Sequence, residues 1–216
     1  MLLYTAKNGE YENLADFLQR KPACKTNVYV NLTNKCTCSC TFCLRNTKKM
    51  LESNSLWLKH EPSAEEIISE FAKYDMNNFK EIIFCGFGEP TMRLDVLLKV
   101  ANYLKQQNKN LPLRINTNGL CELEAGKEIA PLFTNLIDTI SISLNASTAT
   151  EYLNLTHSQF GIKSFDALLT FAVNCKKHVP HVILTVVDCI GKAEISACQA
   201  LADKFDLALR VRSFEK

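Results

Sequence analysis

Four cysteines stand close together near the start of the chain, and their type and spacing suit metal chemistry. They are Cys36, Cys38, Cys40 and Cys43, and three of them, Cys36, Cys40 and Cys43, form a C-x3-C-x2-C pattern. A four-iron iron–sulfur cluster is normally held by four Cys thiolates. Three thiolates on one short loop therefore leave either a distant fourth ligand or one iron open to another molecule.

A zinc site is the alternative interpretation of the same cysteines, because closed tetrahedral zinc sites also use clustered Cys. Such sites usually need a second pair of ligands. The sequence contains no second C-x2-C and no pair of His at ligand spacing. Cys38 lies off the three-cysteine spacing, and we expect it to be a free thiol.

The composition places the chain among globular proteins of a reducing compartment. The length of 216 residues predicts one domain, or one domain with a short appendage. The net charge of +2 is too small to indicate binding to nucleic acid or to a membrane surface. Ten cysteines are too few for a disulfide scaffold, which has more than ~8–10 % Cys. No run reaches the ~18 apolar residues of a membrane span, and the N-terminus lacks a signal-peptide pattern. We expect a cytoplasmic protein.

The chain reads as an extension followed by a repeating core. Residues 1–26 predict a helical extension, with a short amphipathic helix over 10–20. From 27 to 216, a core domain repeats a short apolar strand and a helix-period segment. The strands are predicted at 28–33, 80–85, 112–117, 137–145, 181–188 and 207–214, and the helices at 63–75, 93–108, 122–133, 164–178 and 193–205.

This alternation implies a parallel sheet, in either a partial barrel or a doubly wound arrangement. Parallel strands buried on both faces are apolar throughout. Here several strands alternate instead, as Arg114 and Asn116 do with Leu113 and Ile115. Helices on one side and a polar cavity on the other would produce this pattern. We therefore expect an α/β fold forming a partial (open) (β/α)6 TIM-like barrel.

Several loops with unusual residues follow the predicted strands, at the end where parallel barrels bind ligands. The cysteine loop follows the first strand and Gly86–Pro90 follows the second. The glycines permit close backbone approach, and Glu89 suits an ammonium group better than a phosphate. Asn118, after the third strand, can both donate to and accept from ligand hydroxyls. Phe42 can stack on a planar ligand or shield a cluster from water.

Together these residues carry a family resemblance. Cys36-x3-Cys40-x-Phe42-Cys43 after the first strand, with GFGEP after the second, resembles the radical S-adenosylmethionine (radical SAM) superfamily. Two segments of the sequence look most like the TatD-associated (TatD-linked) radical SAM proteins: YVNLTNKCTCSCTFCLRN and CGFGEPT. They are more distantly similar to glycyl-radical activating enzymes and 7-carboxy-7-deazaguanine synthase. The resemblance runs from about Asn27 to the C-terminus.

The resemblance implies a mechanism and a set of site residues. Cys36, Cys40 and Cys43 would ligate a [4Fe-4S] cluster whose open iron chelates S-adenosyl-L-methionine. One electron would then cleave this cofactor to a 5'-deoxyadenosyl radical, which abstracts hydrogen from an unknown substrate. No catalytic side chain is assigned. The implied cofactor-binding residues are Phe42 near the adenine, Gly86, Phe87, Gly88 and Glu89 near the methionyl ammonium, and Asn118 with Ser143 or Asn145 near the ribose or carboxylate.

The resemblance also implies partners. A low-potential electron donor of the flavodoxin or ferredoxin type is expected. The chain ends soon after the last strand, with no capping domain, which favours a macromolecular substrate or a partner such as a TatD-type hydrolase. The alternatives are an iron–sulfur electron-transfer or redox-sensing protein and a zinc-stabilised binding module. Within the superfamily, an activating-enzyme-like or deazaguanine-synthase-like oxidoreductase is the alternative.

Overall fold

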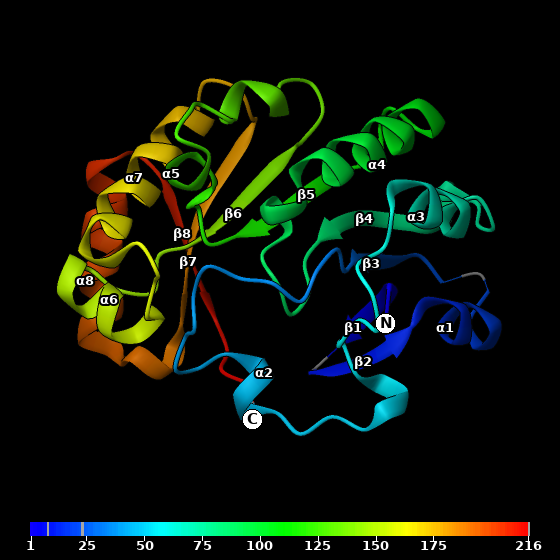
Figure 1. Ribbon diagram of the computed structural model, residues 1–216, viewed down its shortest axis with the longest axis horizontal. Helices are drawn as coiled ribbons and strands as arrows, with labels where there is room; N and C mark the ends of the chain where they lie inside the picture. The colour runs from blue at the N-terminus through cyan, green and yellow to red at the C-terminus, as the bar shows by residue number, and fades with distance from the viewer. Residues whose placement is uncertain (8, 23, 216) are drawn as a thin grey trace. The chain divides into compact units, whose positions relative to one another are not determined.

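The computed structural model describes residues 1–7, 9–22 and 24–215, and the chain divides into two compact units. Unit 1 consists of Met1–Lys35 and Lys49–Ile115, and unit 2 of Cys36–Lys48 and Asn116–Lys216. Both units combine strands with helices (Figure 1). The cysteine loop thus belongs to the unit formed by the C-terminal half of the chain, although the strand before it belongs to unit 1.

The elements of unit 1 lie close to the predicted ones. Its parallel strands begin where β-branched and aromatic residues replace turn residues. Ser63 begins α3 with a capping box, because its hydroxyl accepts from Glu66 N and the Glu66 carboxylate accepts from Ser63 N. The elements are β1 (Leu3–Lys7), β2 (Glu10–Asn13), α1 (Leu14–Arg20), β3 (Thr26–Val30), α3 (Ala64–Phe71), β4 (Phe79–Phe84), α4 (Leu94–Gln107) and β5 (Leu113–Thr117).

Strands β3, β4 and β5 are parallel, as the sequence predicts. Val28 pairs with Ile82, and Ile82 with Leu113, so apolar side chains share one face of the sheet. These three residues are fully buried. Burying each side chain of this size stabilises the fold by roughly 1.5–3 kcal/mol.

The predicted helix over 10–20 is wrong in its first part. Residues 10–13 form β2, which is antiparallel to β1, and β1 in turn pairs antiparallel with β3. The sequence Glu10-Tyr11-Glu12 alternates charged and aromatic residues, which is the period of a strand. Asn13 then caps α1 by accepting a hydrogen bond from Ala15 N. The extension therefore continues the sheet of unit 1, and the division at residue 27 stays a prediction.

Unit 2 contains the last three parallel strands and more helices than predicted. Helices α2 and α6 were not expected, and the predicted helix over 122–133 is interrupted, with α5 followed by the 3₁₀ turn Ala130–Phe133. The elements are α2 (Leu44–Thr47), α5 (Cys121–Ala125), β6 (Thr139–Ser143), α6 (Ala149–Thr156), α7 (Ser164–Cys175), β7 (His181–Val187), α8 (Lys192–Lys204) and β8 (Ala208–Arg212).

The sheet of unit 2 has one apolar and one polar face. Ser143 pairs with Thr185, and Thr185 with Arg210, so three polar side chains form a row across β6, β7 and β8. Arg210 Nη2 also donates to Ser141 Oγ at 2.9 Å. The alternation predicted from the sequence is confirmed on these strands, and it leaves a polar sheet face able to meet a ligand.

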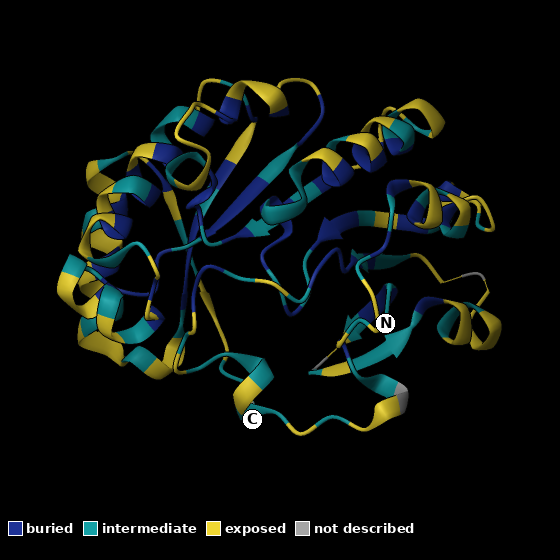
Figure 2. Cartoon of the chain, viewed as in Figure 1, coloured by how far each residue is buried: buried dark blue, intermediate teal, exposed yellow. Residues whose placement is uncertain are grey.

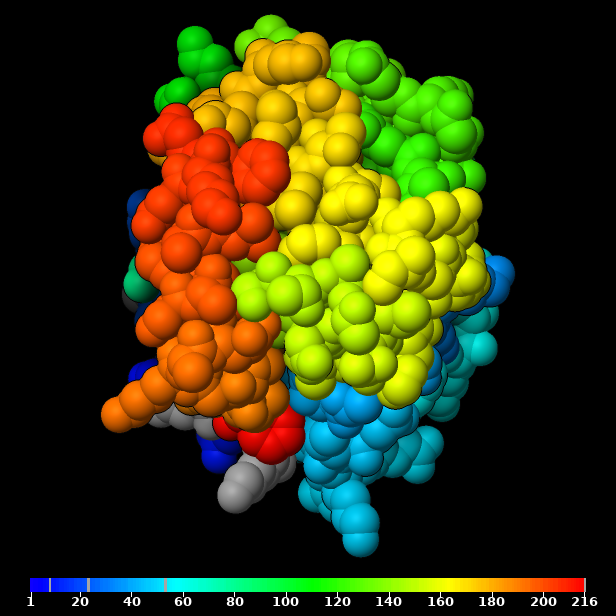
Figure 3. Space-filling model, turned by 90° about the vertical axis from the view of Figure 1, so that its left-hand side faces the viewer, coloured from blue at the N-terminus to red at the C-terminus, as the bar shows by residue number. Residues whose placement is uncertain are grey.

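Helices supply the apolar layers. In Figure 2 the helices are buried along one side and exposed along the other, whereas most strand residues are buried or half-buried. Figure 3 shows the outer sides of α6, α7 and α8 together, with part of the cysteine segment beneath α6. Among the described residues, no helix is both long and apolar enough to cross a lipid bilayer.

Candidate functional site

The cysteine loop has little regular structure of its own and is fastened to the end of α6. Ser39 N donates to Thr156 O and Thr41 N to Leu155 O, both at 2.9 Å, and Gln159 N donates to Thr37 O at 3.0 Å. These three backbone bonds fix both sides of Cys40. A loop held in this way can present thiols in a set arrangement before any metal binds.

The four cysteines of the loop differ in exposure. Cys36, Cys40 and Cys43 are half-buried, whereas Cys38 is buried, and none of the ten cysteines, all of which the structure describes, is joined in a disulfide. Cys43 also begins α2, since its carbonyl accepts from Asn46 N and Thr47 N. The three cysteines of the C-x3-C-x2-C pattern are therefore the more accessible ones.

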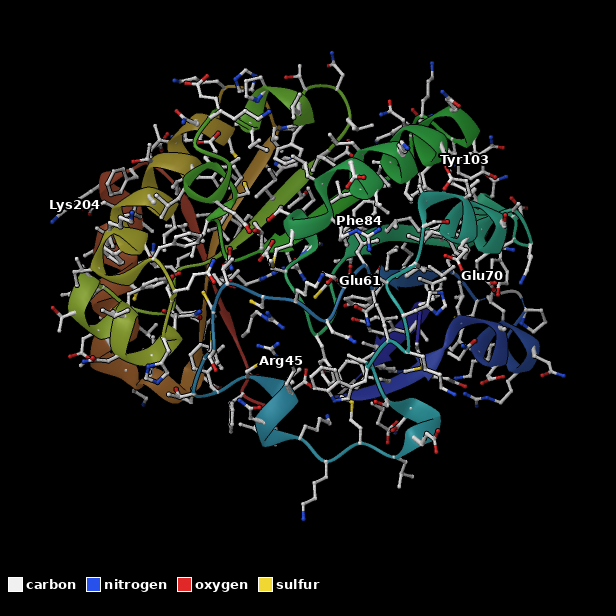
Figure 4. All side chains as sticks on the ribbon, in the orientation of Figure 1. Arg45, Glu61, Glu70, Phe84, Tyr103 and Lys204 are labelled. Atoms are coloured by element: carbon white, nitrogen blue, oxygen red, sulfur yellow. The ribbon has the colours of Figure 1, made fainter. Side chains whose placement is uncertain are left out.

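N–H donors surround the sulfurs. Cys38 N donates to Cys36 Sγ at 3.4 Å, and Arg45 Nε donates to Cys43 Sγ at 3.3 Å. Arg45 also donates to Cys38 O at 3.2 Å, so its side chain turns back from α2 to the loop (Figure 4). Hydrogen bonds to ligand sulfurs stabilise the thiolate and tune the potential of an iron–sulfur cluster.

Arg45 lies two residues after Cys43, and its environment keeps it charged. Burial disfavours the charged form, but the hydrogen bond to Cys43 and the nearby Cys36 and Cys40 thiols raise the pKa of Arg45 overall. A permanent cation suits a site whose thiolates and cluster carry negative charge.

The donor set fits an iron–sulfur cluster. Within the described ranges, no three Cys, His, Asp or Glu side chains converge on one metal-ion position. A four-iron cluster instead takes its thiolates on separate irons. The half-buried thiols, the N–H donors and the nearby guanidinium are compatible with such a cluster held by three cysteines.

Asn118 contacts the same loop. Its Nδ2 donates to Thr37 Oγ1 at 3.0 Å and lies 3.9 Å from Cys36 Sγ and 3.7 Å from Cys38 Sγ. Its Oδ1 accepts from Leu120 N, which fixes the amide's orientation. The structure thus brings this predicted residue beside the cysteines.

Ser143 and Asn145 lie at the carboxyl end of β6. Ser143 is half-buried and faces the polar side of the sheet with Thr185. Asn145 is buried, and its backbone has the left-handed conformation, with a φ of 59°. Its backbone N donates to Thr185 O at 3.3 Å. Asn tolerates this conformation better than most residues, so its place in the turn also has a structural reason.

A cavity of about 510 Å³ adjoins Phe42 in unit 2. Sequence reasoning had assigned Phe42 but missed the residues after β7, of which Glu194 also accepts from Ser147 N at 2.6 Å. The same rule that selected the other strand ends could have found them. The lining residues are Thr41, Phe42, Glu151, Leu155, Cys189, Ile190, Glu194 and Phe214.

In unit 1 the Gly86–Glu89 loop packs on the segment that leads into the cysteines. A Cβ added at Gly88 would lie 2.6 Å from Lys35 O and closer still to Thr33 O. Glu89 N donates to that same Lys35 carbonyl at 2.7 Å. Only glycine leaves room for this approach, and Lys35 immediately precedes Cys36.

The side chains of this loop are also fixed. Phe87 is buried, and the Trp57 ring meets it edge-on with centroids 5.1 Å apart. The buried Glu89 carboxylate accepts from Thr91 N at 3.1 Å and from Thr91 Oγ1 at 2.7 Å. Gly86 lies against the Asn31 side chain, where a Cβ would collide with the amide. The loop is therefore rigid, with a carboxylate already oriented.

Comparison with known proteins identifies the family. Residues 30–193 match the model of the radical SAM superfamily, and the chain belongs to it. Members of the superfamily are enzymes that bind a [4Fe-4S] cluster and S-adenosylmethionine, so this protein is an enzyme with these two cofactors.

One curated relative is a probable GTP 3',8-cyclase from Thermococcus kodakarensis, 26% identical over 192 residues. The alignment covers 88% of this chain and 57% of that protein, so the chain spans little more than half of its relative. A second is the GTP 3',8-cyclase of Paenarthrobacter nicotinovorans, 29% identical over 138 residues, with 62% of this chain and 36% of that protein covered.

Solved structures show the fold. A radical SAM methyltransferase from Sphaerobacter thermophilus superposes with a TM-score of 0.61 at 14% identity, covering 99% of this chain and 65% of that one. Streptococcus suis SuiB bound to S-adenosylmethionine gives a TM-score of 0.65 at 13% identity, covering 93% and 42%. SuiB has also been solved with its precursor peptide SuiA. The predicted open α/β barrel of the radical SAM type is confirmed.

Proposed function

We propose that the protein cleaves S-adenosylmethionine reductively and uses the product radical to abstract hydrogen from a substrate. The observation that carries this proposal is the cysteine loop: its three thiols are half-buried, the Cys36 and Cys43 sulfurs accept N–H donors, and Thr41 and Phe42 of the same loop line a cavity. When bound and reduced, the cluster would supply one electron to the sulfonium of S-adenosylmethionine, which would split into methionine and a 5'-deoxyadenosyl radical.

In this proposal Cys36, Cys40 and Cys43 hold the cluster, and Cys38 does not. Arg45 donates to Cys43 and offsets part of the negative charge of the thiolates. Asn118 holds Thr37 in place and offers its amide to the ribose or carboxylate of the cofactor. These residues bind and orient, and none of them transfers a proton.

The cavity at Phe42 would take the adenine. Its volume of about 510 Å³ lies within the range of small-molecule sites, and aromatic and aliphatic side chains of Phe42, Ile190 and Phe214 contribute to its walls. Flat apolar walls favour a planar heterocycle through stacking. The Glu151 and Glu194 carboxylates in the same lining would accept hydrogen bonds from an amino group.

The remaining predicted residues would bind the polar parts of the cofactor. Gly86, Phe87, Gly88 and Glu89 would meet the methionyl ammonium, since this loop has a fixed carboxylate and packs on the residue before Cys36. Ser143 or Asn145 would contact the ribose or carboxylate. The buried Phe87 ring, which Trp57 meets edge-on, would help exclude competing hydrogen donors.

For the substrate we infer a polar molecule bound on the Ser143–Thr185–Arg210 face, with a macromolecule or a partner-bound group as the favoured form. Membership of the TatD-associated subgroup, with a TatD-type hydrolase as partner, is supported by the motif wording alone. A low-potential flavodoxin or ferredoxin would supply electrons. The relatives named as GTP 3',8-cyclases favour a nucleotide-related substrate as the second candidate. The predicted cytoplasmic location belongs to this proposal.

The test is anaerobic reconstitution with iron and sulfide, followed by reduction, addition of S-adenosylmethionine and measurement of 5'-deoxyadenosine. Ala at Cys36, Cys40 or Cys43 should abolish both the cluster absorbance and cleavage, whereas Cys38→Ala should spare both. Iron bound without cleavage would favour an electron-transfer protein. Stoichiometric zinc without iron would contradict both iron-based functions, and loss of the cluster in Cys38→Ala alone would overturn the ligand assignment.

A further inference from the structure

A second cavity, of about 920 Å³, lies in unit 1, and none of its lining residues belongs to the cysteine loop. Apart from Asn54 and Lys80, all its lining residues precede residue 30, where the superfamily match begins. It is therefore built by the extension of this chain onto the core. Its volume is that of a site for a molecule of nucleotide size.

The cavity opens at the amino ends of the strands of unit 1. Thr26 and Asn27, at the start of β3, and Lys80, near the start of β4, belong to its lining. Gly86 lies just beyond the other end of β4. At a rise of ~3.3 Å per residue along an extended strand, it is about 20 Å from Lys80. A ligand in this cavity would thus not contact the Gly86–Glu89 loop.

The lining is strongly cationic. It contains five positive side chains and two carboxylates, a surplus of three charges where the whole chain carries a net charge of +2. Glu12 is already used, because Arg20 Nε donates to it at 3.1 Å. The positive residues are Lys7, Arg20, Lys21, Lys25 and Lys80.

Three of these lysines are available for a ligand. In the part of the chain that the structure describes, Lys7, Lys25 and Lys80 are exposed and form no ion pair with a carboxylate. Lys21 instead lies over the Phe17 ring, 5.9 Å from its centroid. Ammonium groups on three different segments around one cavity would repel each other until an anion with several charges enters.

A neutral acceptor lies in the same lining. Asn54 Oδ1 is buried and has no hydrogen-bond partner. Leaving a buried acceptor without a donor costs free energy. A ligand N–H or O–H that bonds to it therefore contributes more to binding than the same bond would at a solvent-exposed acceptor. The rings of Tyr11 and Phe17 also line the cavity and offer apolar surface.

From these observations we propose that the cavity binds a nucleotide carrying at least two phosphates, of which a nucleoside diphosphate is the smallest example. Lys7, Lys25 and Lys80 bind the phosphates through charge-assisted hydrogen bonds. Asn54 Oδ1 accepts from the base or ribose, and Tyr11 or Phe17 packs against the base. This site does not depend on the cluster or on S-adenosylmethionine.

The test is equilibrium dialysis of the full chain against ADP at low and high salt, with pyrophosphate as the base-free probe. We expect ADP to bind more weakly at high salt. The double variant Lys25→Ala/Lys80→Ala should weaken ADP and pyrophosphate binding by about tenfold for each lysine removed. Asn54→Leu should weaken ADP binding by about tenfold and leave pyrophosphate binding unchanged.

Lys204→Ala is the matched control, since Lys204 is an exposed lysine at the end of α8 in unit 2 (Figure 4). It should bind ADP as the unchanged protein does. The proposal is overturned if ADP does not bind, if Lys204→Ala weakens ADP as much as the double variant, or if S-adenosylmethionine displaces ADP. The salt dependence of the unchanged protein tests the charge argument even if a variant folds poorly.

Discussion

Replacing Gly88 by Ala should damage the protein in a way that the structure makes quantitative. The added Cβ would lie 2.6 Å from Lys35 O, 2.7 Å from the Thr33 carbonyl carbon, and closer still to Thr33 O. Real Cβ atoms essentially never approach within 3.0 Å, so the backbone on one side must move. That backbone leads directly into Cys36.

The cost has two parts. Overpacking against fixed backbone costs about 1–3 kcal/mol. The Glu89 N–Lys35 O hydrogen bond, 2.7 Å long in the structure, would be stretched or lost, at about 1 kcal/mol. We therefore expect Gly88→Ala to lower the free energy of unfolding by about 2–4 kcal/mol. It should also weaken S-adenosylmethionine binding, because the displaced segments carry Glu89 and lead into Cys36, both of which belong to the proposed cofactor site.

Gly126→Ala is the matched control. Gly126 has a φ of 65° and no atom within 4 Å of an added Cβ, so its substitution costs about 1–2 kcal/mol of backbone strain without a collision. Urea unfolding and the 5'-deoxyadenosine assay would be run on both variants. Both should lose stability, but only Gly88→Ala should lose cleavage at limiting cofactor. Normal stability and cleavage in Gly88→Ala would refute the close-packing argument.

Three further changes test other parts of the protein. Phe42→Ala should raise the S-adenosylmethionine concentration for half-maximal cleavage about tenfold, whereas Phe42→Leu should stay within a fewfold; equal effects would argue against an adenine pocket. The pKa of Glu61 is lowered mainly by a hydrogen bond from Thr33 and, to a smaller extent, by nearby positive side chains. The ionised Glu61 therefore stabilises the fold above the ordinary pKa of 4.5, and this stabilisation is lost as the pH falls through the lowered pKa. Thermal unfolding of Glu61→Gln should accordingly show less loss of stability on acidification than the unchanged protein, and parallel curves would contradict this. Tyr4→Phe removes the donor to Cys85 O, 3.1 Å away, and should cost about 1 kcal/mol in urea unfolding, so a variant as stable as the unchanged protein would show that the bond contributes nothing.

The parallel strands were predictable because their apolar runs are bounded by turn residues. All six predicted core strands exist, with ends that differ by a few residues. The first strand is an instructive case: residues 28–33 were expected, but β3 ends at Val30, and beyond it the Asn31 and Thr33 side chains donate to Leu56 O and to Glu61. Side-chain bonds to a distant segment have no local signature.

The candidate site was predictable only in part. The three cysteines, Phe42 and the Gly86–Glu89 loop stand out by spacing or by residue type. Arg45, Ile190 and Phe214 do not, since their importance depends on contacts with the loop or the cavity that only the folded chain creates. The helix α6, which fastens the loop, was missed because Ala149–Thr156 is only eight residues long and gives a short pattern.

The pairing of β1 with β3 has a consequence for how safely the chain folds. A parallel core strand with an open edge would offer unpaired N–H and C=O groups to other chains, which is a common start of aggregation. In unit 1 that edge is covered by β1, and the outermost strand is β2, which is four residues long and carries Glu10 and Glu12. Short length and like charges discourage a second copy from adding a strand. The β1–β2 hairpin therefore reduces the tendency of this edge to pair with a second copy of the chain.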